Sequence, residues 1–182
     1  MRASIVALML GAMAIGCAQA EDSPHLIGGS VGYGSLEFEH RNSQLYDGGD
    51  GATMDIWYRY MFSEHWGAEL SYMGGESGII SAIFDSISNI SDLRYHGGRV
   101  SVYGELPLYR RGGLYAKAGY GSYNVRYDLD DVGQDTSDQG FVGSLGFQHR
   151  FNSGLGLHVE YQRLSLDKLT GDSFNFGLSW RF

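Results

Sequence analysis

The feature that most constrains this chain is a strict alternation of apolar and polar side chains along most of its length. In the last ten residues, every even position from Phe174 to Phe182 is a large apolar residue, and every odd position is small or polar. Successive side chains of a β-strand point to opposite faces of a sheet, so this period indicates a strand with one apolar face. Helical periodicity is missing beyond the N-terminal segment, except at residues 78–90, which predict either a short helix or a packed loop.

The same alternation predicts seven further strands, and therefore eight in all. Their apolar faces consist of Ile27, Val31 and Tyr33; Met54, Ile56, Tyr58, Tyr60 and Phe62; Trp66, Ala68, Leu70 and Tyr72; Val100, Val102, Leu106 and Leu108; Leu114, Ala116, Ala118 and Tyr120; Phe141, Leu145, Phe147 and Phe151; and Leu155, Leu157, Val159 and Tyr161. The connections alternate between long and short, and we expect the long ones at residues 40–52, 74–92, 128–139 and 165–172. This order is typical of an antiparallel up-and-down meander with one elaborated rim.

The N-terminus predicts a removable secretory signal peptide. Arg2 precedes an apolar run over residues 5–15, and an Ala-Gln-Ala cleavage site at residues 18–20 follows it. The apolar run is shorter than the roughly 20 residues that a helix needs to span a bilayer. We therefore divide the chain into a signal peptide, residues 1–20, and one domain, residues 21–182. Cys17, the only cysteine, falls in the leader; the alternative of a lipid-modified Cys17 lacks the leucine expected three residues earlier, where Ala14 stands.

Composition excludes several classes of protein. Hydrophobic residues make up 43% of the chain, which is too many for a disordered protein. A mean hydropathy of −0.22 is too low for a bundle of membrane helices. The formal net charge of −8 disfavours a nucleic-acid partner, because the phosphate backbone repels an acidic surface.

Alternation alone leaves two folds open, because a soluble barrel or sandwich turns its apolar face inward and a membrane barrel turns it outward. Three features favour the membrane barrel, and the polar face is the first of them. It carries five cations and four anions among glycine, serine, glutamine and tyrosine, a nearly balanced set that suits an enclosed interior. We therefore predict a charge network in the lumen of a membrane barrel, formed by Asp55, Arg59, Glu69, Arg99, Glu105, Lys117, Arg150, Glu160 and Arg181. Pairing is the expected structural role of these charges, and a gating role for a pair such as Glu69 and Arg150 is the alternative.

Aromatic residues support the membrane interpretation, because they fall at the two ends of the predicted strands. Membrane barrels place aromatic girdles at both interfaces with water. The expected girdle at the tight turns contains Tyr60, Phe62, Trp66, Tyr115, Phe147, Phe151, Trp180 and Phe182. The expected girdle at the long connections contains Tyr33, Tyr72, Tyr120, Phe141 and Tyr161.

The C-terminal strand, which ends Trp180-Arg181-Phe182, resembles the closing strand of the OmpA-like and OmpX/Ail-like outer-membrane β-barrel families. The stretch from Gly140 to Phe182 is similar to their last strands. The resemblance implies an all-β, eight-stranded antiparallel up-and-down transmembrane barrel in a Gram-negative outer membrane, with both termini in the periplasm. It also implies that the outer-membrane insertion machinery reads the terminal apolar set, Phe176, Leu178, Trp180 and Phe182.

Such a barrel has an interior about wide enough for its own side chains, so we expect a filled lumen and a non-enzymatic protein. A lipid A deacylase would show His-x-Ser on one strand face. Here Phe151 stands two residues after His149, where that motif has its serine. The acidic connection that starts at Asp128 lacks the glutamate that an EF-hand carries at its twelfth place, where Gln139 stands. We therefore predict no catalytic residues, no cofactor and no metal. A narrow channel for small or hydrophobic solutes and a lipid A-modifying enzyme are the alternatives.

The second long connection is unusually apolar for an exposed loop, and contiguous exposed apolar area tends to mark a binding site. The candidate surface-binding residues are Ile79, Ile80, Ile83, Phe84, Ile87 and Ile90. We expect a role in envelope integrity or adhesion. The expected partners are outer-membrane lipid and lipopolysaccharide, the insertion machinery, and a host or surface ligand bound by the loops.

Overall fold

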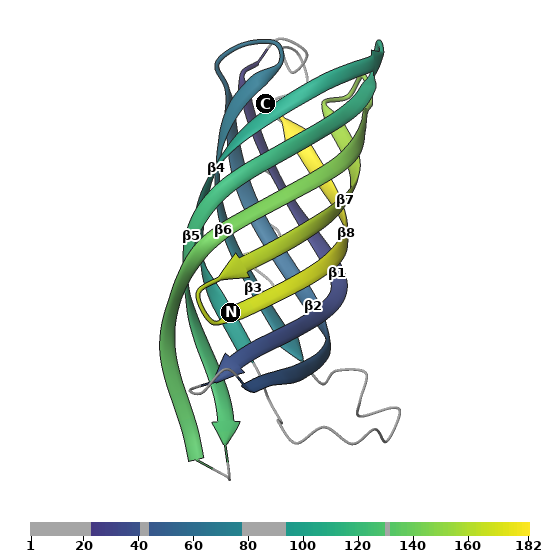
Figure 1. Cartoon of the computed structure of the whole chain (residues 1–182). Helices are drawn as coiled ribbons and strands as arrows, with labels where there is room; N and C mark the ends of the chain where they lie inside the picture. The colour runs from purple at the N-terminus through teal and green to yellow at the C-terminus, as the bar shows by residue number, and fades with distance from the viewer. Residues whose placement is uncertain (1–22, 41–43, 78–93, 130–131) are drawn as a thin grey trace, which may run out of the picture.

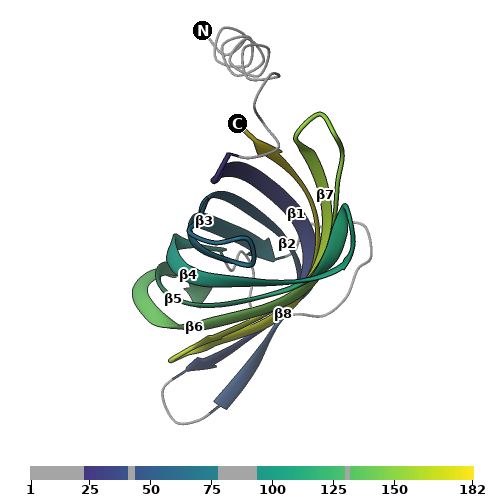
Figure 2. The same cartoon turned by 90° about the horizontal axis from the view of Figure 1, so that it is seen from above.

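Eight antiparallel strands form a closed barrel in the computed structural model, which describes residues 23–40, 44–77, 94–129 and 132–182. Each strand pairs with the next one along the chain, and the first pairs with the last (Figures 1 and 2). The predicted strand number and topology are confirmed. The strands are β1 (His25–His40), β2 (Gln44–Met61), β3 (Trp66–Ser77), β4 (Arg94–Tyr109), β5 (Gly112–Leu129), β6 (Val132–Arg150), β7 (Leu155–Leu166) and β8 (Leu169–Arg181).

The barrel closes where β1 meets β8, in a continuous register from Leu26 opposite Arg181 to Phe38 opposite Leu169. Closure gives the backbone groups of both terminal strands a partner, which a sheet in hydrocarbon requires. Glycine makes this seam fit. A Cβ on Gly32 would lie 1.8 Å from the Asn175 side chain, because the interior on that side is already filled.

The strands are longer than the roughly ten residues that cross a bilayer, and they run to 19 residues in β6. The prediction of four long connections is therefore wrong in three places. Only residues 41–43 separate β1 from β2, only residues 130–131 separate β5 from β6, and only Asp167 and Lys168 separate β7 from β8. The β5–β6 hairpin extends past the other strands in Figure 1. The connection between β3 and β4, residues 78–93, remains long.

The sense of the alternation reverses toward the end of the barrel that carries these connections. On β7, Arg163 and Ser165 are exposed, whereas Leu164 is 3% exposed and faces inward. A sheet in water buries its apolar face and a sheet in lipid exposes it. The reversal therefore marks where the wall leaves the apolar layer. Inside this end, the apolar cluster consists of Leu36, Met73, Tyr95, Tyr123, Val125, Val142, Leu164, Leu166 and Leu169.

A buried carboxylate holds the last connection at this end. Asp138 on β6 accepts hydrogen bonds at Oδ2 from the backbone N–H groups of Lys168 and Leu169, at 3.0 and 3.1 Å. Its Oδ1 accepts a third from the backbone of Gln139 at 3.0 Å. Asp138 thus fixes the β7–β8 turn against the neighbouring strand, since a buried carboxylate needs such donors.

Two predictions lie outside the described residues: the signal peptide with Cys17, and the apolar loop set from Ile79 to Ile90. In the part of the chain that the structure describes, no helix has the length and apolar character needed to cross a membrane.

Candidate functional site

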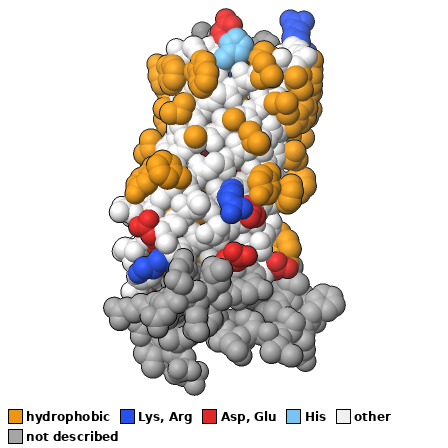
Figure 3. All heavy atoms as spheres, viewed as in Figure 1, with side chains coloured by type: hydrophobic (Ala, Val, Ile, Leu, Met, Phe, Trp, Pro, Cys, Tyr) orange, Lys and Arg blue, Asp and Glu red, His pale blue; other side chains and the backbone are white. Residues whose placement is uncertain are grey.

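The outer wall of the barrel is apolar over its middle. On β8, Phe176 is 66% exposed and Leu178 is 54% exposed, and both point away from the interior together with Phe182. Figure 3 shows apolar side chains over most of one face, with charged side chains toward the ends. The predicted outward set is thus placed on the wall, with one exception. Tyr115 is buried inside the barrel, so its assignment to an aromatic girdle was wrong.

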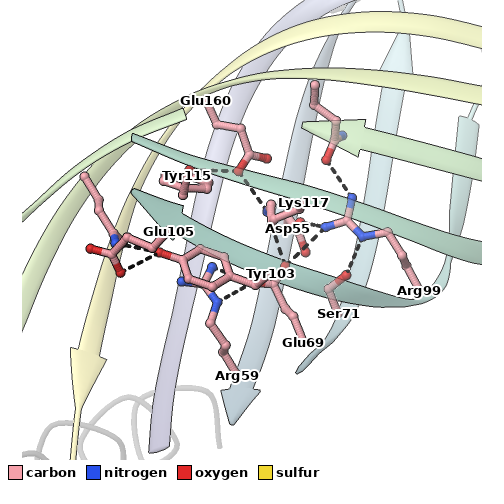
Figure 4. A network of polar contacts seen from close by, with 12 residues as sticks. Asp55, Arg59, Glu69, Ser71, Arg99, Tyr103, Glu105, Tyr115, Lys117 and Glu160 are labelled. Carbon is pink, nitrogen blue, oxygen red and sulfur yellow. Dashed lines mark hydrogen bonds and ion pairs between the residues drawn. The ribbon is translucent and has the colours of Figure 1, made fainter. Parts of the chain in front are cut away.

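The centre of the lumen holds an ion-pair network around Glu69 of β3, which is 1% exposed (Figure 4). Its Oε2 lies 2.5 Å from Nη2 of Arg59 on β2, and its Oε1 lies 3.2 Å from Nζ of Lys117 on β5. Lys117 also contacts Oε2 of Glu160 on β7 at 2.8 Å. These contacts tie β2, β3, β5 and β7 together across the lumen.

Arg99 of β4 adds the remaining central charge pair. Its Nη2 lies 2.8 Å from Oδ2 of Asp55 and 3.6 Å from Oε1 of Glu69. Nε donates to Oγ of Ser71 at 3.0 Å, and Nη1 donates to Oε1 of Gln162 at 2.7 Å. Such full use of the guanidinium is what a buried charge requires to offset its desolvation.

The other three predicted lumen charges form a separate group nearer the tight-turn end. Nη2 of Arg150 donates to Oε2 of Glu105, and Arg181, half-buried, interacts electrostatically with both. The suggested pair of Glu69 with Arg150 is therefore wrong, because each has nearer partners. Tyr103 links the two groups: its hydroxyl lies 3.2 Å from Glu105, and its ring lies 3.6 Å from the Arg59 guanidinium.

A layer of large buried side chains lies in the lumen between the network and the tight turns. It consists of Leu26, Trp57, Met61, Tyr103 and Tyr115. The Tyr115 hydroxyl donates to Oε2 of Glu160 at 2.8 Å, and the Arg59 guanidinium also lies over the Trp57 ring at 4.3 Å. The layer thus packs against the charges, and its buried side chains occupy the lumen at this level.

The apolar cluster at the opposite end of the lumen was missed from the sequence. Residues 163–166, Arg-Leu-Ser-Leu, continue the alternation past the girdle residue Tyr161, but with the apolar side chains on the inward face. We assigned the end of this stretch to a loop because its apolar residues lie on the opposite face from those of the membrane part. The lumen therefore has three packed layers: aromatic, ionic and apolar.

Exposed ion pairs lie on the outer surface of the barrel, at the end where the alternation has reversed. Arg94 pairs with Glu76 at 2.7 Å, Arg126 with Asp135 at 2.7 Å, and Arg163 with Asp172. The hydrogen bonds from Arg126 hold the pKa of Asp135 below its ordinary value. These polar pairs lie beyond the apolar wall and face the surroundings of the barrel.

Two histidines, His149 and His158, pack against aromatic side chains. Nδ1 of His149 lies 2.8 Å from the Tyr109 hydroxyl, and its ring meets Phe151 edge-on. His158 is buried against the rings of Trp57 and Tyr115. Among the described residues, no group of three or more His, Cys, Asp or Glu side chains is placed to hold a metal ion.

Comparison with solved structures finds barrels of the same kind at low sequence identity. Neisserial surface protein A (NspA) aligns with a TM-score of 0.68 and 10% identity, covering 88% of this chain and 98% of that one. The N-terminal barrel domain of Pseudomonas aeruginosa OprF gives 0.59 and 12%, with the same coverage of 88% and 98%. Ail, the attachment invasion locus protein of Yersinia pestis, gives 0.56 and 18%, covering 86% of this chain and 98% of that one. A search of curated proteins gives no match.

The sequence profile of the outer membrane protein beta-barrel domain matches residues 4–182, nearly the whole chain. It agrees with the closed antiparallel barrel, the apolar outer wall and the enclosed charges, and it confirms the resemblance seen in the last strands. This chain belongs to the outer membrane protein β-barrel family.

Proposed function

We propose that this outer-membrane protein is a non-enzymatic barrel with a sealed lumen that acts through its outer rim, in envelope integrity and adhesion. In this proposal both termini lie in the periplasm, and the ends of β5 and β6 that protrude from the wall lie outside the cell. The three packed layers of the lumen carry the proposal, because large buried side chains occupy the lumen at each of these levels. The reversed alternation supports a position outside the lipid for the protruding end, since it gives that end a water-facing surface and an apolar core of its own.

Planar-bilayer recording tests the sealed lumen. We expect no steady ionic conductance from the refolded barrel, because the central ionic layer lies between two layers of large buried side chains. Leu164→Ser and Leu166→Ser together, which open the outer apolar layer, are expected to leave it closed, since the ionic and aromatic layers remain. Regular open-channel steps from the wild-type barrel would instead support the channel for small or hydrophobic solutes.

Adhesion is assigned to the connection between β3 and β4. Ail is described as an attachment invasion locus protein and has been solved with the heparin analogue sucrose octasulfate. For this chain, the apolar residues Ile79 to Ile90 support an apolar contact with a partner at the cell surface.

Deletion of residues 77–91 tests that assignment. We expect cells carrying the deletion to lose binding to host cells or matrix, while the barrel still reaches the outer membrane and shows heat-modifiable migration on a gel. Replacement of Asn152 and Ser153 by alanine, in an exposed turn at the opposite rim, is the control and should leave binding unchanged. Full binding by the deletion variant would contradict the adhesion half of the proposal.

A further inference from the structure

A polar cavity of about 400 Å³ lies on the outside of the barrel wall, across β4, β5 and β6. It is lined by two arginines, one histidine and one carboxylate, together with neutral polar side chains: Arg94, His96, Asn124, Arg126, Asp135, Thr136 and Ser137. Two guanidinium groups and one imidazole therefore lie close together on a chain whose formal charge is −8.

The strand register places the two arginines directly opposite each other, Arg94 on β4 against Arg126 on β5. Like charges at opposed positions of an antiparallel pair are unfavourable. Each guanidinium has an acidic partner on its far side, Glu76 on β3 and Asp135 on β6. Both pairs are more than half exposed on the arginine side, and exposed ion pairs add little stability. An anion between the arginines would relieve their repulsion, and exposed pairs can rearrange to bind it.

The position of the cavity indicates the kind of anion. Along β5, the outward residues run from Tyr120 to Ser122, Asn124 and Arg126, so the wall changes from aromatic to charged. Tyr120 packs edge-on against Phe141 of β6, four positions along the strands from Asn124 and Ser137 of the cavity. Aromatic girdles mark the level of lipid headgroups. The cavity lies on the outer face of the same strands, beyond the girdle, where the charged headgroup of a neighbouring lipid is expected.

We infer that Arg94, Arg126 and His96 form a binding site for the phosphate groups of an outer-leaflet glycolipid. Guanidinium groups bind phosphate through paired N–H donors. Two neighbouring guanidinium groups match the double charge of a phosphate better than they match the single charge of a carboxylate. Asn124 and Ser137, paired across the strands, supply neutral donors beside them. This inference rests on the proposed orientation, which places this end of the barrel outside the cell.

Binding of purified lipid A to the refolded barrel in detergent, measured by titration and by native mass spectrometry, tests the site. We expect the double variant Arg94→Gln/Arg126→Gln to bind bis-phosphorylated lipid A about tenfold more weakly than wild type. Arg110→Gln/Arg111→Gln is the matched control, because it removes two exposed arginines from the opposite rim. It should bind like wild type. Equal losses in the two double variants would mean general charge attraction and would overturn the site.

Two further arms separate the sources of phosphate and guard against misfolding. Chemically dephosphorylated lipid A should bind wild type and the Arg94/Arg126 variant equally weakly, and inorganic phosphate should not compete at equal concentration. Competition at equal concentration would point to free phosphate and overturn the glycolipid. Asp135→Asn removes a competing carboxylate and should tighten lipid A binding about threefold, a gain that misfolding does not produce. Unchanged or weaker binding by this variant would count against the site.

The orientation is tested separately by labelling intact cells with a membrane-impermeant maleimide. Asp167→Cys, in the exposed β7–β8 turn, should react, and Arg111→Cys, in the exposed β4–β5 turn, should not. The reverse pattern would contradict the proposed orientation. The titration with purified lipid A does not depend on orientation, so the two failures are distinguishable.

Discussion

Glu69→Gln is expected to destabilise the barrel by about 3–5 kcal/mol, the usual cost of removing one partner of a buried ion pair. Glu69 is the one carboxylate that contacts three cations in the network, Arg59, Arg99 and Lys117. The amide keeps the shape of the side chain but loses its charge, so these cations remain buried with too little negative charge. Equilibrium unfolding in urea, followed by heat-modifiable migration and tryptophan fluorescence, measures the loss.

Glu76→Gln is the matched control for this prediction. Glu76 makes the same chemical type of pair, with Arg94, but both side chains are largely exposed. Exposed pairs contribute about 0–1 kcal/mol, so this variant should unfold close to the wild-type urea concentration. If the two variants lost equal stability, the ionic layer would not be enclosed as the structure places it.

Leu145→Arg is expected to cost about 2–4 kcal/mol of stability in a lipid bilayer, because its charge would lie near the middle of the apolar wall. Leu145 is 65% exposed on β6, between the girdle residue Phe141 and the tight-turn end. The effect depends on lipid around the barrel. In a soluble barrel, an arginine at an exposed position would cost almost nothing.

Ser122→Arg shows whether depth in the membrane is the cause. Ser122 also faces outward, on β5, but lies beyond the girdle residue Tyr120. There the expected cost is about 0–1 kcal/mol. Reversible unfolding of both variants from vesicles gives the comparison. Equal costs, or a Leu145→Arg variant that stays soluble and monomeric without detergent, would contradict the lipid-facing wall.

The sequence was sufficient for the features that depend on local period. Alternation identified all eight strands and sorted the inward charges from the outward apolar residues, because side-chain direction in a strand depends only on position parity. The chain contains 28 glycines among 182 residues, and the alternation gives no reason for them. The structure supplies one at Gly28, where a Cβ would lie 2.3 Å from the Trp57 ring, since neighbouring strands crowd the interior.

The tertiary structure alone decided the features that depend on which strands meet across the lumen. The sequence placed Glu69 and Arg150 on the same inward face, yet Glu69 contacts Lys117 and Arg150 contacts Glu105. Parity fixes a face, whereas partner choice depends on strand tilt and on the relative heights of residues far apart in the chain. The length of the strands was hidden for a related reason. Beyond the membrane, the surroundings of the wall change from lipid to water, so the apolar side chains of a strand change from the outer face to the inner face. The alternation therefore shifts by one residue within a single strand, and this shift looks like the end of the strand in the sequence.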